Sequence, residues 1–374
     1  MEQPGPRPVR LTRAAASTIA ESVAERASDA LPAGGAPELV SAIRLAGEVR
    51  AEVPDPMDGR TLELWEALAT LGAVDLTLAR VAEPHLDALA ILAQARRHGE
   101  IDESDWRERS TEWQATPLWQ VYAAEGSGRL RARAAGPGWR LTGPKPWCSL
   151  AEHATYALVT AWVDDEHRGL FAVDLAADGV TREAESSVSG QSGVWASRGL
   201  TQVQSTGILL DDVHAVAVGS PGWYLTRPGF AWGGAGVAAI WYGATVALAR
   251  TLRASATRRT PDQVALLHLG AVDTALWRAR SVLESAAAVA DDPLTPEDES
   301  EHVAGVVRQV VADAAEEVLH RVGHALGPAP LTGDEDHARR VADLTVYLRQ
   351  HHAERDLAVA GQRVVNDPSG WSWW

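Results

Sequence analysis

The sequence predicts an α+β fold in which a helical region, a β-rich region and a second helical region follow one another. Two observations predict this order. Apolar residues recur every three to four positions in the first and last regions, which is typical of helices buried on one side. In the middle region, turns rich in Gly and Pro separate short runs of β-branched and aromatic residues. We therefore expect three domains, at residues 1–112, 113–222 and 223–374.

The first domain is expected to hold four helices after a disordered lead-in over residues 1–13, which are polar and rich in Pro and Arg. Thr12 or Ser17 can cap the first helix, and Asp75 can cap the fourth. The fourth helix carries an apolar stripe at helical spacing that begins at Leu78. The four helices are predicted at residues 12–30, 37–52, 60–72 and 76–99.

The middle domain is predicted to be a β-barrel or sandwich. Its best defined part is Gly138–Ser149, where Thr142-Gly143-Pro144 predicts a tight turn between two strands. A later strand is followed by Asp211-Asp212-Val213, which resembles a strand-to-loop motif of a known family and so implies a loop there. The other strands are predicted at residues 118–123, 130–134, 156–162, 170–173 and 203–210.

The last domain is predicted to be an antiparallel bundle of four long helices joined by short connections. The first, over residues 233–255, is rich in Ala and Gly, which allows a neighbouring helix to approach closely. Thr260-Pro261 and Thr295-Pro296 place a Thr cap and a first-turn Pro at the starts of the next two helices. These helices are expected to run to residues 290 and 326, and the last helix covers residues 336–360.

Composition narrows the class of partner and the compartment. The chain has 374 residues, a formal net charge of −16 and a pI near 5.2. This balance speaks against nucleic acid or an anionic membrane surface as the main partner. The one cysteine, Cys148, excludes an intramolecular disulfide. No signal peptide is recognised, and the apolar stretches fall short of the roughly 20 residues of a membrane span. We expect a cytoplasmic protein with no membrane partner.

The stretch from Gly138 to Ala161 carries the clearest chemical signal. Trp147 and Ser149 stand together where the second predicted strand ends. An aromatic face beside a hydroxyl can hold a planar heteroaromatic cofactor, because stacking and one hydrogen bond fix its plane and its edge. An ordinary β-hairpin with a buried tryptophan is the alternative. Cys148, between the two, is expected to pack rather than to react.

This stretch resembles the middle domain of the acyl-CoA dehydrogenase superfamily, whose pattern is Trp/Tyr-x-Leu-x-Gly-x-Lys-x-Trp-x-Ser/Thr-x-x-x-x-Ala. The segment over residues 75–94 also resembles the family's N-terminal helical domain, and the order of the three domains is the same. The resemblance implies FAD bound between the β-domain and the bundle, in a site that includes Trp147, Cys148 and Ser149. It also implies a homodimer or tetramer. The residues that match in register are Leu141, Gly143, Lys145, Trp147, Ser149 and Ala154.

In the family that the chain resembles, a glutamate on the C-terminal bundle removes the α-proton of an acyl-CoA while the flavin accepts the β-hydride. Counting onward from Asp343 places His351 at that position, and Glu354 follows one turn later. We take His351 and Glu354 as the candidate catalytic residues. A histidine there brings the sequence closer to the family's monooxygenase branch, in which histidines near the flavin assist oxygen chemistry. An exposed polar helix end is the alternative for His351, and His85 is expected to be structural.

The cofactor motifs of the family are incomplete in this chain. Only Glu125-Gly126-Ser127 echoes the loop that helps to hold flavin and substrate. The motif that reaches the FAD pyrophosphate is reduced to the segment from Arg258 to Gln263. The best remaining candidates for phosphate contacts are Arg227 and Arg258. We therefore expect FAD to be weakly held, with FMN as the alternative cofactor.

Three functions stay open. The first is a flavoenzyme that oxidises an acyl thioester such as an acyl-CoA and passes the electrons to an acceptor. The second is a two-component monooxygenase of the same fold, supplied with reduced flavin by a flavin reductase. The third is a non-catalytic subunit that partners a flavin-binding paralogue. A metal centre is not expected, because the two Glu-x-x-His pairs at residues 299–302 and 317–320 lie about 27 Å apart on one helix.

Overall fold

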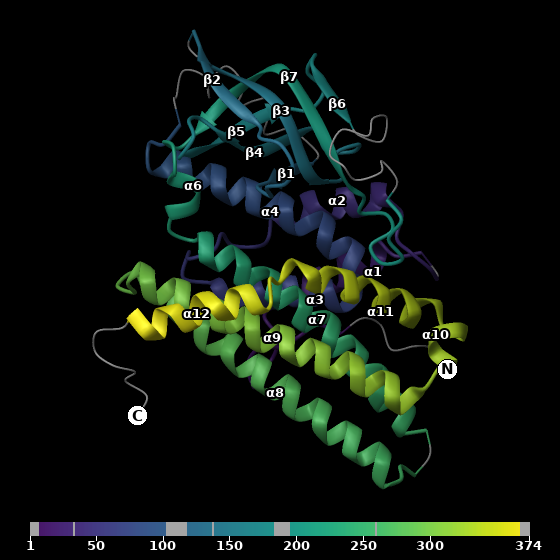
Figure 1. The fold of residues 1–374 in the computed structure, drawn as a ribbon. Helices are drawn as coiled ribbons and strands as arrows, with labels where there is room; N and C mark the ends of the chain where they lie inside the picture. The colour runs from purple at the N-terminus through teal and green to yellow at the C-terminus, as the bar shows by residue number, and fades with distance from the viewer. Residues whose placement is uncertain are drawn as a thin grey trace. The chain divides into compact units, whose positions relative to one another are not determined.

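The computed structural model describes residues 7–32, 34–101, 118–136, 138–182, 195–258 and 260–366. These residues group into two compact units, whose helices and strands are labelled in Figure 1. The helical unit comprises Met1–Ala36, Glu52–Ala79 and Ala231–Trp374, and the sheet unit comprises Pro37–Ala51 and Arg80–Phe230. Helices together with a sheet confirm the α+β class. The division into three domains stays a prediction, and its boundary at residue 112 lies outside the described residues.

The helical unit contains most of the helices that the apolar periodicity predicts. α3 is buried along nearly its whole length, and α7 is buried along most of its length. α8 and α9 are joined by a short connection and run antiparallel, side by side (Figure 1). Ser17 caps α1 by accepting from the backbone N–H of Ala20. The helices are α1 (Thr18–Asp29), α3 (Thr61–Val74), α7 (Phe230–Ala256), α8 (Gln263–Asp291), α9 (Glu297–Leu326), α10 (Ala329–Gly333), α11 (Glu335–Tyr347) and α12 (Glu354–Asn366).

The prediction of one continuous last helix is wrong. α11 ends at Tyr347, a 3₁₀ turn η2 (Leu348–Gln350) follows, and α12 begins only at Glu354. Ala353 has a φ of 47°, in the left-handed region that residues other than Gly adopt only rarely. The break places His351 at the junction of two helices rather than on a helix face. Its side chain is only 7% exposed there.

Residues 7–13 are not the disordered lead-in that the sequence predicts. The backbone N–H of Leu11 donates to Glu66 Oε1, and that of Ser17 donates to Glu66 Oε2. The side chains of Val9 and Leu11 are buried. The buried carboxylate of Glu66 in α3 therefore holds the segment before α1. The prediction of disorder failed because it rested on the polar composition of the segment and overlooked its two buried apolar residues. The rest of the expected lead-in lies outside the described residues.

α3 and α7 approach one another closely, as the Ala- and Gly-rich composition of α7 predicts. A Cβ added at Gly243 would lie 1.7 Å from the carbonyl oxygen of Ala69. A Cβ added at Gly72 would lie 2.3 Å from the carbonyl oxygen of Ile240. Neither distance leaves room for a side chain, so these two glycines set the separation of the helices.

Replacing Gly243 with alanine is expected to destabilise the helical unit by at least about 3 kcal/mol, because the added methyl group overlaps a backbone oxygen. Gly305→Ala is the control, since a Cβ at Gly305 of α9 meets open space. That change should stabilise the protein by about 1 kcal/mol through helix propensity. Chemical denaturation measures both variants. Equal stability of the two would show that α3 and α7 do not touch at Gly243.

α7 is the one helix among the described residues that is long and apolar enough to cross a membrane. The expectation that every apolar stretch is too short for a span is therefore wrong for this helix. However, 72% of its apolar window is buried inside the structure. Its apolar residues form an interior helix of the helical unit.

The sheet unit holds a seven-stranded sheet, helix α2 (Leu39–Arg50), most of α4 (Leu76–Arg97) and the short α6 (Trp223–Thr226). The strand order is β1-β4-β2-β3-β7-β5, and a further pairing of β4 with β5 closes five strands into a ring. β6 pairs with β7. The strands are β1 (Trp119–Tyr122), β2 (Arg131–Ala135), β3 (Gly138–Ser149), β4 (Tyr156–Trp162), β5 (Arg168–Asp174), β6 (Val180–Arg182) and β7 (Ser205–Val218).

Gly138–Ser149 is a single strand, β3, so the tight turn expected at Thr142-Gly143-Pro144 is wrong. β3 pairs antiparallel with β7, and its register shifts between Leu141 and Gly143. The φ of Gly143 is 127°, so the glycine accommodates a β-bulge instead of a chain reversal. The loop expected at residues 211–213 is likewise part of a strand, β7.

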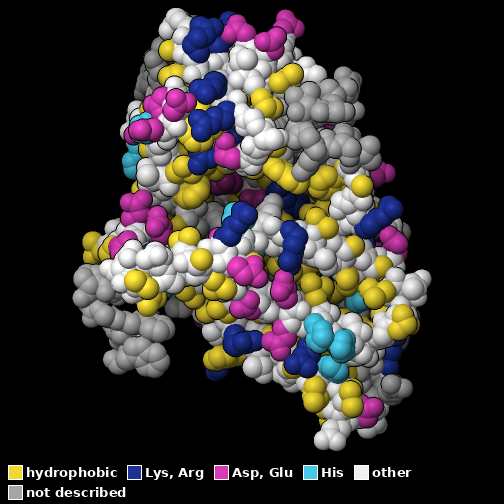
Figure 2. Space-filling model, in the orientation of Figure 1, with side chains coloured by type: hydrophobic (Ala, Val, Ile, Leu, Met, Phe, Trp, Pro, Cys, Tyr) yellow, Lys and Arg dark blue, Asp and Glu magenta, His cyan; other side chains and the backbone are white. Residues whose placement is uncertain are grey.

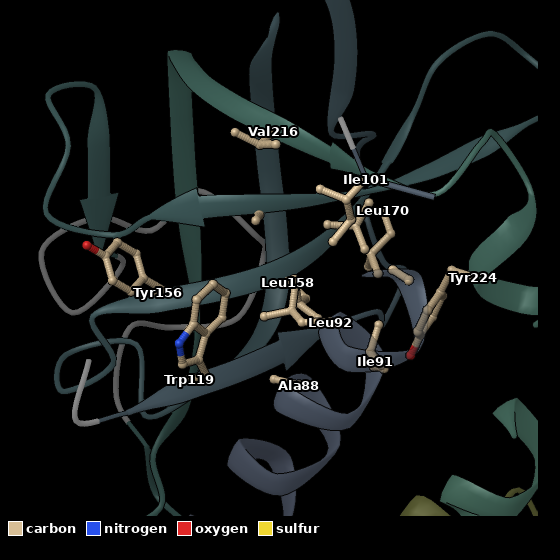
Figure 3. Close-up of a cluster of buried hydrophobic side chains, with 13 residues drawn as sticks. Ala88, Ile91, Leu92, Ile101, Trp119, Tyr156, Leu158, Leu170, Val216 and Tyr224 are labelled. Carbon is tan, nitrogen blue, oxygen red and sulfur yellow. The ribbon is translucent and has the colours of Figure 1, made fainter. Parts of the chain in front are cut away.

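The interior of the sheet unit lies between α4 and the sheet. Figure 3 shows Ala88, Ile91 and Leu92 of α4 beside Trp119 and Leu158, which come from two neighbouring strands. Each of these five residues is at most 3% exposed. The face of α4 that carries Ala88, Ile91 and Leu92 therefore covers the sheet, and Arg80, near the start of the helix, reaches Ser149 at the end of β3.

Candidate functional site

Trp147 lies at a second register shift of β3, between Lys145 and Cys148. Its side chain is 46% exposed, although its neighbours along the strand are buried. Its φ of 59° lies in the left-handed region, which costs such a residue about 1–3 kcal/mol. Strain of this kind clusters at functional sites. The bulge therefore turns a large aromatic face outward, and the alternative of a buried tryptophan is excluded.

Ser149 is the centre of a polar network inside the sheet unit. Its Oγ accepts from Arg80 Nη2 at 3.1 Å and lies 2.7 Å from Ser205 Oγ. Arg80 is held in turn by Glu83, 2.9 Å away. The phenol of Tyr122 donates to the carbonyl oxygen of Ser149. The network fixes the hydroxyl and brings a positive charge beside it.

Cys148 and Lys145 anchor the strand around Trp147. Cys148 is fully buried and its Sγ donates to the carbonyl oxygen of Lys145 at 3.3 Å, so it packs as expected. Lys145 Nζ donates to Glu125 Oε1 at 3.0 Å and to two oxygens of Thr160 at 2.8 Å each. Burial lowers the pKa of Lys145, although the carboxylate of Glu125 opposes the effect. A place for Cys148 in a cofactor site stays a prediction.

His351 lies in a compact group of side chains from the helical unit. Its Nε2 is 3.0 Å from Gln309 Oε1 of α9, and its Nδ1 is 3.3 Å from Asp356 Oδ2 of α12. Its ring centroid is 6.2 Å from that of Trp241 of α7. The guanidinium carbon of Arg308 lies over the same indole, 5.1 Å from its centroid. The group joins an imidazole to an amide, a carboxylate and a cation, so the alternative of an exposed helix end does not hold for His351.

The neighbours of His351 determine which ring nitrogen carries the proton. Gln309 Nε2 donates to Asp313 Oδ1 at 2.8 Å, so the amide oxygen faces His351 and accepts from Nε2–H. The neutral ring therefore keeps its lone pair on Nδ1, opposite Asp356. Burial and the nearby Arg308 lower the pKa of His351, against the attraction of Asp356. The imidazole is thus neutral at pH 7 and can accept a proton at Nδ1.

Glu354 does not join this group. It lies in the first turn of α12 and is exposed to solvent. A carboxylate that removes a weakly acidic proton needs a water-poor site that raises its pKa. The catalytic role expected for Glu354 stays a prediction, and its surroundings give it no support.

The two arginines expected to contact phosphate differ in their surroundings. Arg227 is buried in the sheet unit, where Nη1 donates to Gln94 Oε1 at 3.0 Å and Nη2 lies 3.5 Å from Asp87. Its charge is therefore engaged inside the unit. Arg258 follows the end of α7 and is exposed, which leaves its guanidinium accessible to a ligand. A phosphate contact stays a prediction for both residues.

His85 is a structural residue, as expected. Its Nδ1 accepts from the backbone N–H of Trp119 at 3.1 Å, which ties α4 to β1. Burial, with the charge of Arg50 as a second cause, lowers the pKa of His85 to about 4. Only the neutral ring can accept this hydrogen bond, so protonation of His85 destabilises the folded state.

Acid is expected to destabilise the sheet unit through His85. Its folded pKa of about 4 lies below the ordinary value of 6.5, so the unfolded chain takes up the proton first and stability falls with pH. Between roughly pH 7.5 and pH 5 this residue should cost about 2 kcal/mol. The side chain of His85→Asn keeps an acceptor but cannot titrate. Over this pH range the free energy of unfolding of the variant should therefore fall by about 2 kcal/mol less than that of the unaltered protein. Denaturation curves at both pH values measure the difference, and parallel losses in the two proteins would contradict the assignment.

Comparison with known proteins rests on structure. Neither a scan against models of protein families nor a search of curated protein sequences gives a match. KijD3, in complex with FMN and dTDP-3-amino-2,3,6-trideoxy-4-keto-3-methyl-D-glucose, matches with a TM-score of 0.70 and 18% identity, over 94% of this chain and 93% of that chain. A nitrososynthase from Micromonospora carbonacea var. africana also gives 0.70 and 18%, over 92% and 93%. Methanesulfinate monooxygenase from Pseudomonas fluorescens gives 0.71 and 18%, over 94% and 97%.

The chain has an acyl-CoA dehydrogenase-like fold. The matches cover more than nine-tenths of the chain, so the resemblance stated from the stretch around Trp147 is confirmed at the level of the fold. At 18% identity, these matches establish the acyl-CoA dehydrogenase-like fold and carry no activity over to this chain.

The sequence singled out Trp147, Ser149 and His351 as candidates, but it did not identify the residues that hold their side chains in place. Arg80 belongs to the helical segment that carries the resemblance, so its position could have been singled out. Gln309 lies 42 residues before His351, and no sequence pattern links the two. The pairing exists only because α9 passes the junction between η2 and α12.

Proposed function

We propose that the chain is a flavin-dependent monooxygenase that receives reduced flavin from a separate reductase. The observation that carries the proposal is the environment of His351, a neutral imidazole held between Gln309 and Asp356. By the count from Asp343, we expect this histidine at the position where a dehydrogenase of the fold carries its glutamate. A neutral imidazole can take up and release a proton near pH 7, as the insertion of oxygen requires. Two of the matching structures are a methanesulfinate monooxygenase and a nitrososynthase, which supports the same direction.

The sheet unit offers residues that fit a flavin ring. Trp147 holds an exposed indole outward on strained backbone, which suits stacking on a planar heteroaromatic ring. Ser149 offers a hydroxyl whose position is fixed by Arg80 and Ser205. These residues would hold the ring when the cofactor is bound. We propose FMN in preference to FAD, because little of the motif that reaches a pyrophosphate is kept; KijD3 is seen with FMN.

The reaction balances with two electrons and two protons. Reduced flavin, when bound, would supply the two electrons, and one atom of O₂ would then enter the substrate while the other would leave as water. We assign His351 to carry one of the protons at Nδ1. Asp356 faces that nitrogen and stabilises the protonated ring, and Arg308 opposes it. The fully buried Trp241 lies edge-on to the imidazole, with the ring centroids 6.2 Å apart.

Oxidation of an acyl thioester is the less favoured function. It requires a carboxylate in a dry site, and the candidate, Glu354, is exposed. A non-catalytic subunit is also less favoured, because such a protein has no need of a neutral histidine with a fixed tautomer. Both alternatives are outcomes that the experiment below distinguishes.

A cytoplasmic homo-oligomer completes the proposal. α8 exposes more than half of the side chains of Leu266, Leu267 and Trp277, and apolar residues of this size on one helix favour association. Light scattering on the purified protein measures the oligomeric state. A strictly monomeric protein at all concentrations would contradict this part of the proposal.

Oxygen-dependent turnover with reduced FMN tests the proposed function. The purified protein is mixed with FMN, NADH, a flavin reductase and isotopically labelled O₂, together with methanesulfinate, an amino-sugar nucleotide and simple sulfides as probes. The expected result is a product that carries one labelled oxygen atom and forms only when the protein is present. Bleaching of a protein-bound flavin by an acyl-CoA without O₂ would support dehydrogenation instead. Failure to bind flavin in any redox state would support the non-catalytic subunit.

A further inference from the structure

Three histidines from two helices lie together in the helical unit, away from His351. His320 and His324 are one turn apart on α9, and their ring centroids are 4.0 Å apart. His268 of α8 has its ring centroid 6.4 Å from that of His324. Figure 2 shows histidine side chains gathered at the surface. The cluster joins residues that are more than fifty positions apart in the sequence.

The buried member of the cluster has an unsatisfied nitrogen. His268 is 8% exposed, and its Nδ1 has no hydrogen-bond partner among the described residues. A buried polar atom without a partner costs roughly 1–3 kcal/mol, so such atoms are rare unless something binds them. His320 and His324 are exposed, so a ligand can reach the cluster from solvent.

The chemistry of the cluster favours a divalent transition metal. Neutral imidazole nitrogens are common ligands of Zn²⁺, and two histidines four residues apart on a helix can bind one ion. His324 lies two residues before the end of α9 at Leu326, where the helix dipole favours a positive charge. The nearest arginine along the helix, Arg321, is 3.6 Å from Glu317, which reduces its repulsion of a cation.

We propose that His268, His320 and His324 form a binding site for a zinc-like divalent metal, with water as the remaining ligand. As they stand, the three rings do not converge on one point, and no such group of three does so within the described residues. Closing the site requires rotation of His320 and His324 about their side-chain bonds. Both are exposed, and exposed side chains change rotamer readily.

The position of the site defines its effect. The short connection between α8 and α9 joins the end of α8 to the start of α9, whereas His268 is near the start of α8 and His324 near the end of α9. The metal would therefore pin the open end of the antiparallel pair. Gln309, which bonds to His351, lies 11 residues before His320, or about 16 Å along the helix. The site is thus separate from the His351 group, and it does not rest on the proposed function.

Metal binding by the full chain, freed of any histidine tag, tests the proposal. Isothermal titration with ZnCl₂ is expected to show one saturable site, and the melting temperature should rise with Zn²⁺ because only the folded state holds the three ligands together. His268→Ala and the double variant His320→Ala/His324→Ala should each weaken Zn²⁺ binding by at least about tenfold. Loss of a residue that only hydrogen-bonds to a metal ligand typically lowers metal affinity by this factor, and loss of a ligand itself should lower it at least as much. His302→Ala, on the same helix, is the matched control and should bind Zn²⁺ like the unaltered chain. Circular dichroism confirms that each variant is folded.

Three outcomes would overturn the proposal. One is the absence of saturable binding at about millimolar Zn²⁺, an affinity too weak to be specific. Another is binding that survives the loss of both His320 and His324. The third is binding that is lost in this double variant but unchanged in His268→Ala, which would reduce the site to two histidines on one helix. A Co²⁺ absorption spectrum that changes in both His268→Ala and the double variant, and not in the control, would support the three-histidine site directly.

Discussion

Replacing His351 with alanine is expected to lower the rate of oxygenation by about 10²–10⁴-fold, the usual contribution of a positioned acid–base residue. The loss is expected in turnover rather than in flavin binding, because the proposed role of His351 is to carry a proton. The measurement is the rate at which labelled product forms with saturating reduced FMN. His352→Ala is the matched control, since His352 is the neighbouring histidine but is exposed. That control should retain nearly full activity.

The pH dependence separates a proton carrier from a residue that only supports the fold. Activity requires the neutral ring, so it should rise with pH through the pKa of His351, which lies below 6.5. Asp356→Asn removes the attraction that raises this pKa, so the rising limb of the profile should move to lower pH. Full activity in His351→Ala, or an identical pH profile in Asp356→Asn, would remove His351 from the mechanism.

Replacing Trp147 with alanine is expected to weaken FMN binding by roughly ten- to hundredfold, because a stacked aromatic ring contributes about 1–3 kcal/mol. Fluorescence titration under anaerobic conditions, with oxidised and reduced FMN, measures the change. Trp277→Ala is the control, since Trp277 is 54% exposed on α8. It should leave the affinity for FMN unchanged.

The stability of the Trp147 variant distinguishes a binding role from a packing role. Trp147 is 46% exposed, so alanine removes little packing, and the strain of a φ of 59° persists because alanine also carries a Cβ. The melting temperature should therefore change little. A marked loss of stability with unchanged FMN affinity would identify Trp147 as a structural residue.

Periodicity predicted most of the helices, because each helix buries one face and the apolar residues of that face recur every three to four positions in the sequence. The caps at Ser17 and Asp75 were also predictable, since both side chains bond to the first turn of the helix that follows. The strand β3 was not. Gly143 permits either a turn or a bulge, and only the pairing of β3 with β7 along its length decides between them. The break before α12 was not predictable either, because no Gly or Pro lies between Tyr347 and Glu354 to indicate the end of a helix.

The candidate site was predicted in part. The positions of Trp147 and His351 followed from a resemblance in register, and both prove to be distinctive, one by its strained exposure and the other by its fixed tautomer. The partners that produce these properties were not predictable. Gln309 and Arg308 reach the junction at His351 from another helix, and a single sequence contains no record of that contact.

The reaction of protein-bound reduced FMN with O₂ tests the central claim most directly. An anaerobic mixture of reduced FMN with excess protein is combined with O₂ in a stopped-flow instrument, and the visible absorbance of oxidised flavin is followed. We predict that this absorbance returns with a time course different from that of free reduced FMN and with a delay after O₂ is consumed. The time course should also change in His351→Ala. A time course identical to that of free reduced FMN at every protein concentration would contradict the assignment of this chain as a flavin-dependent monooxygenase.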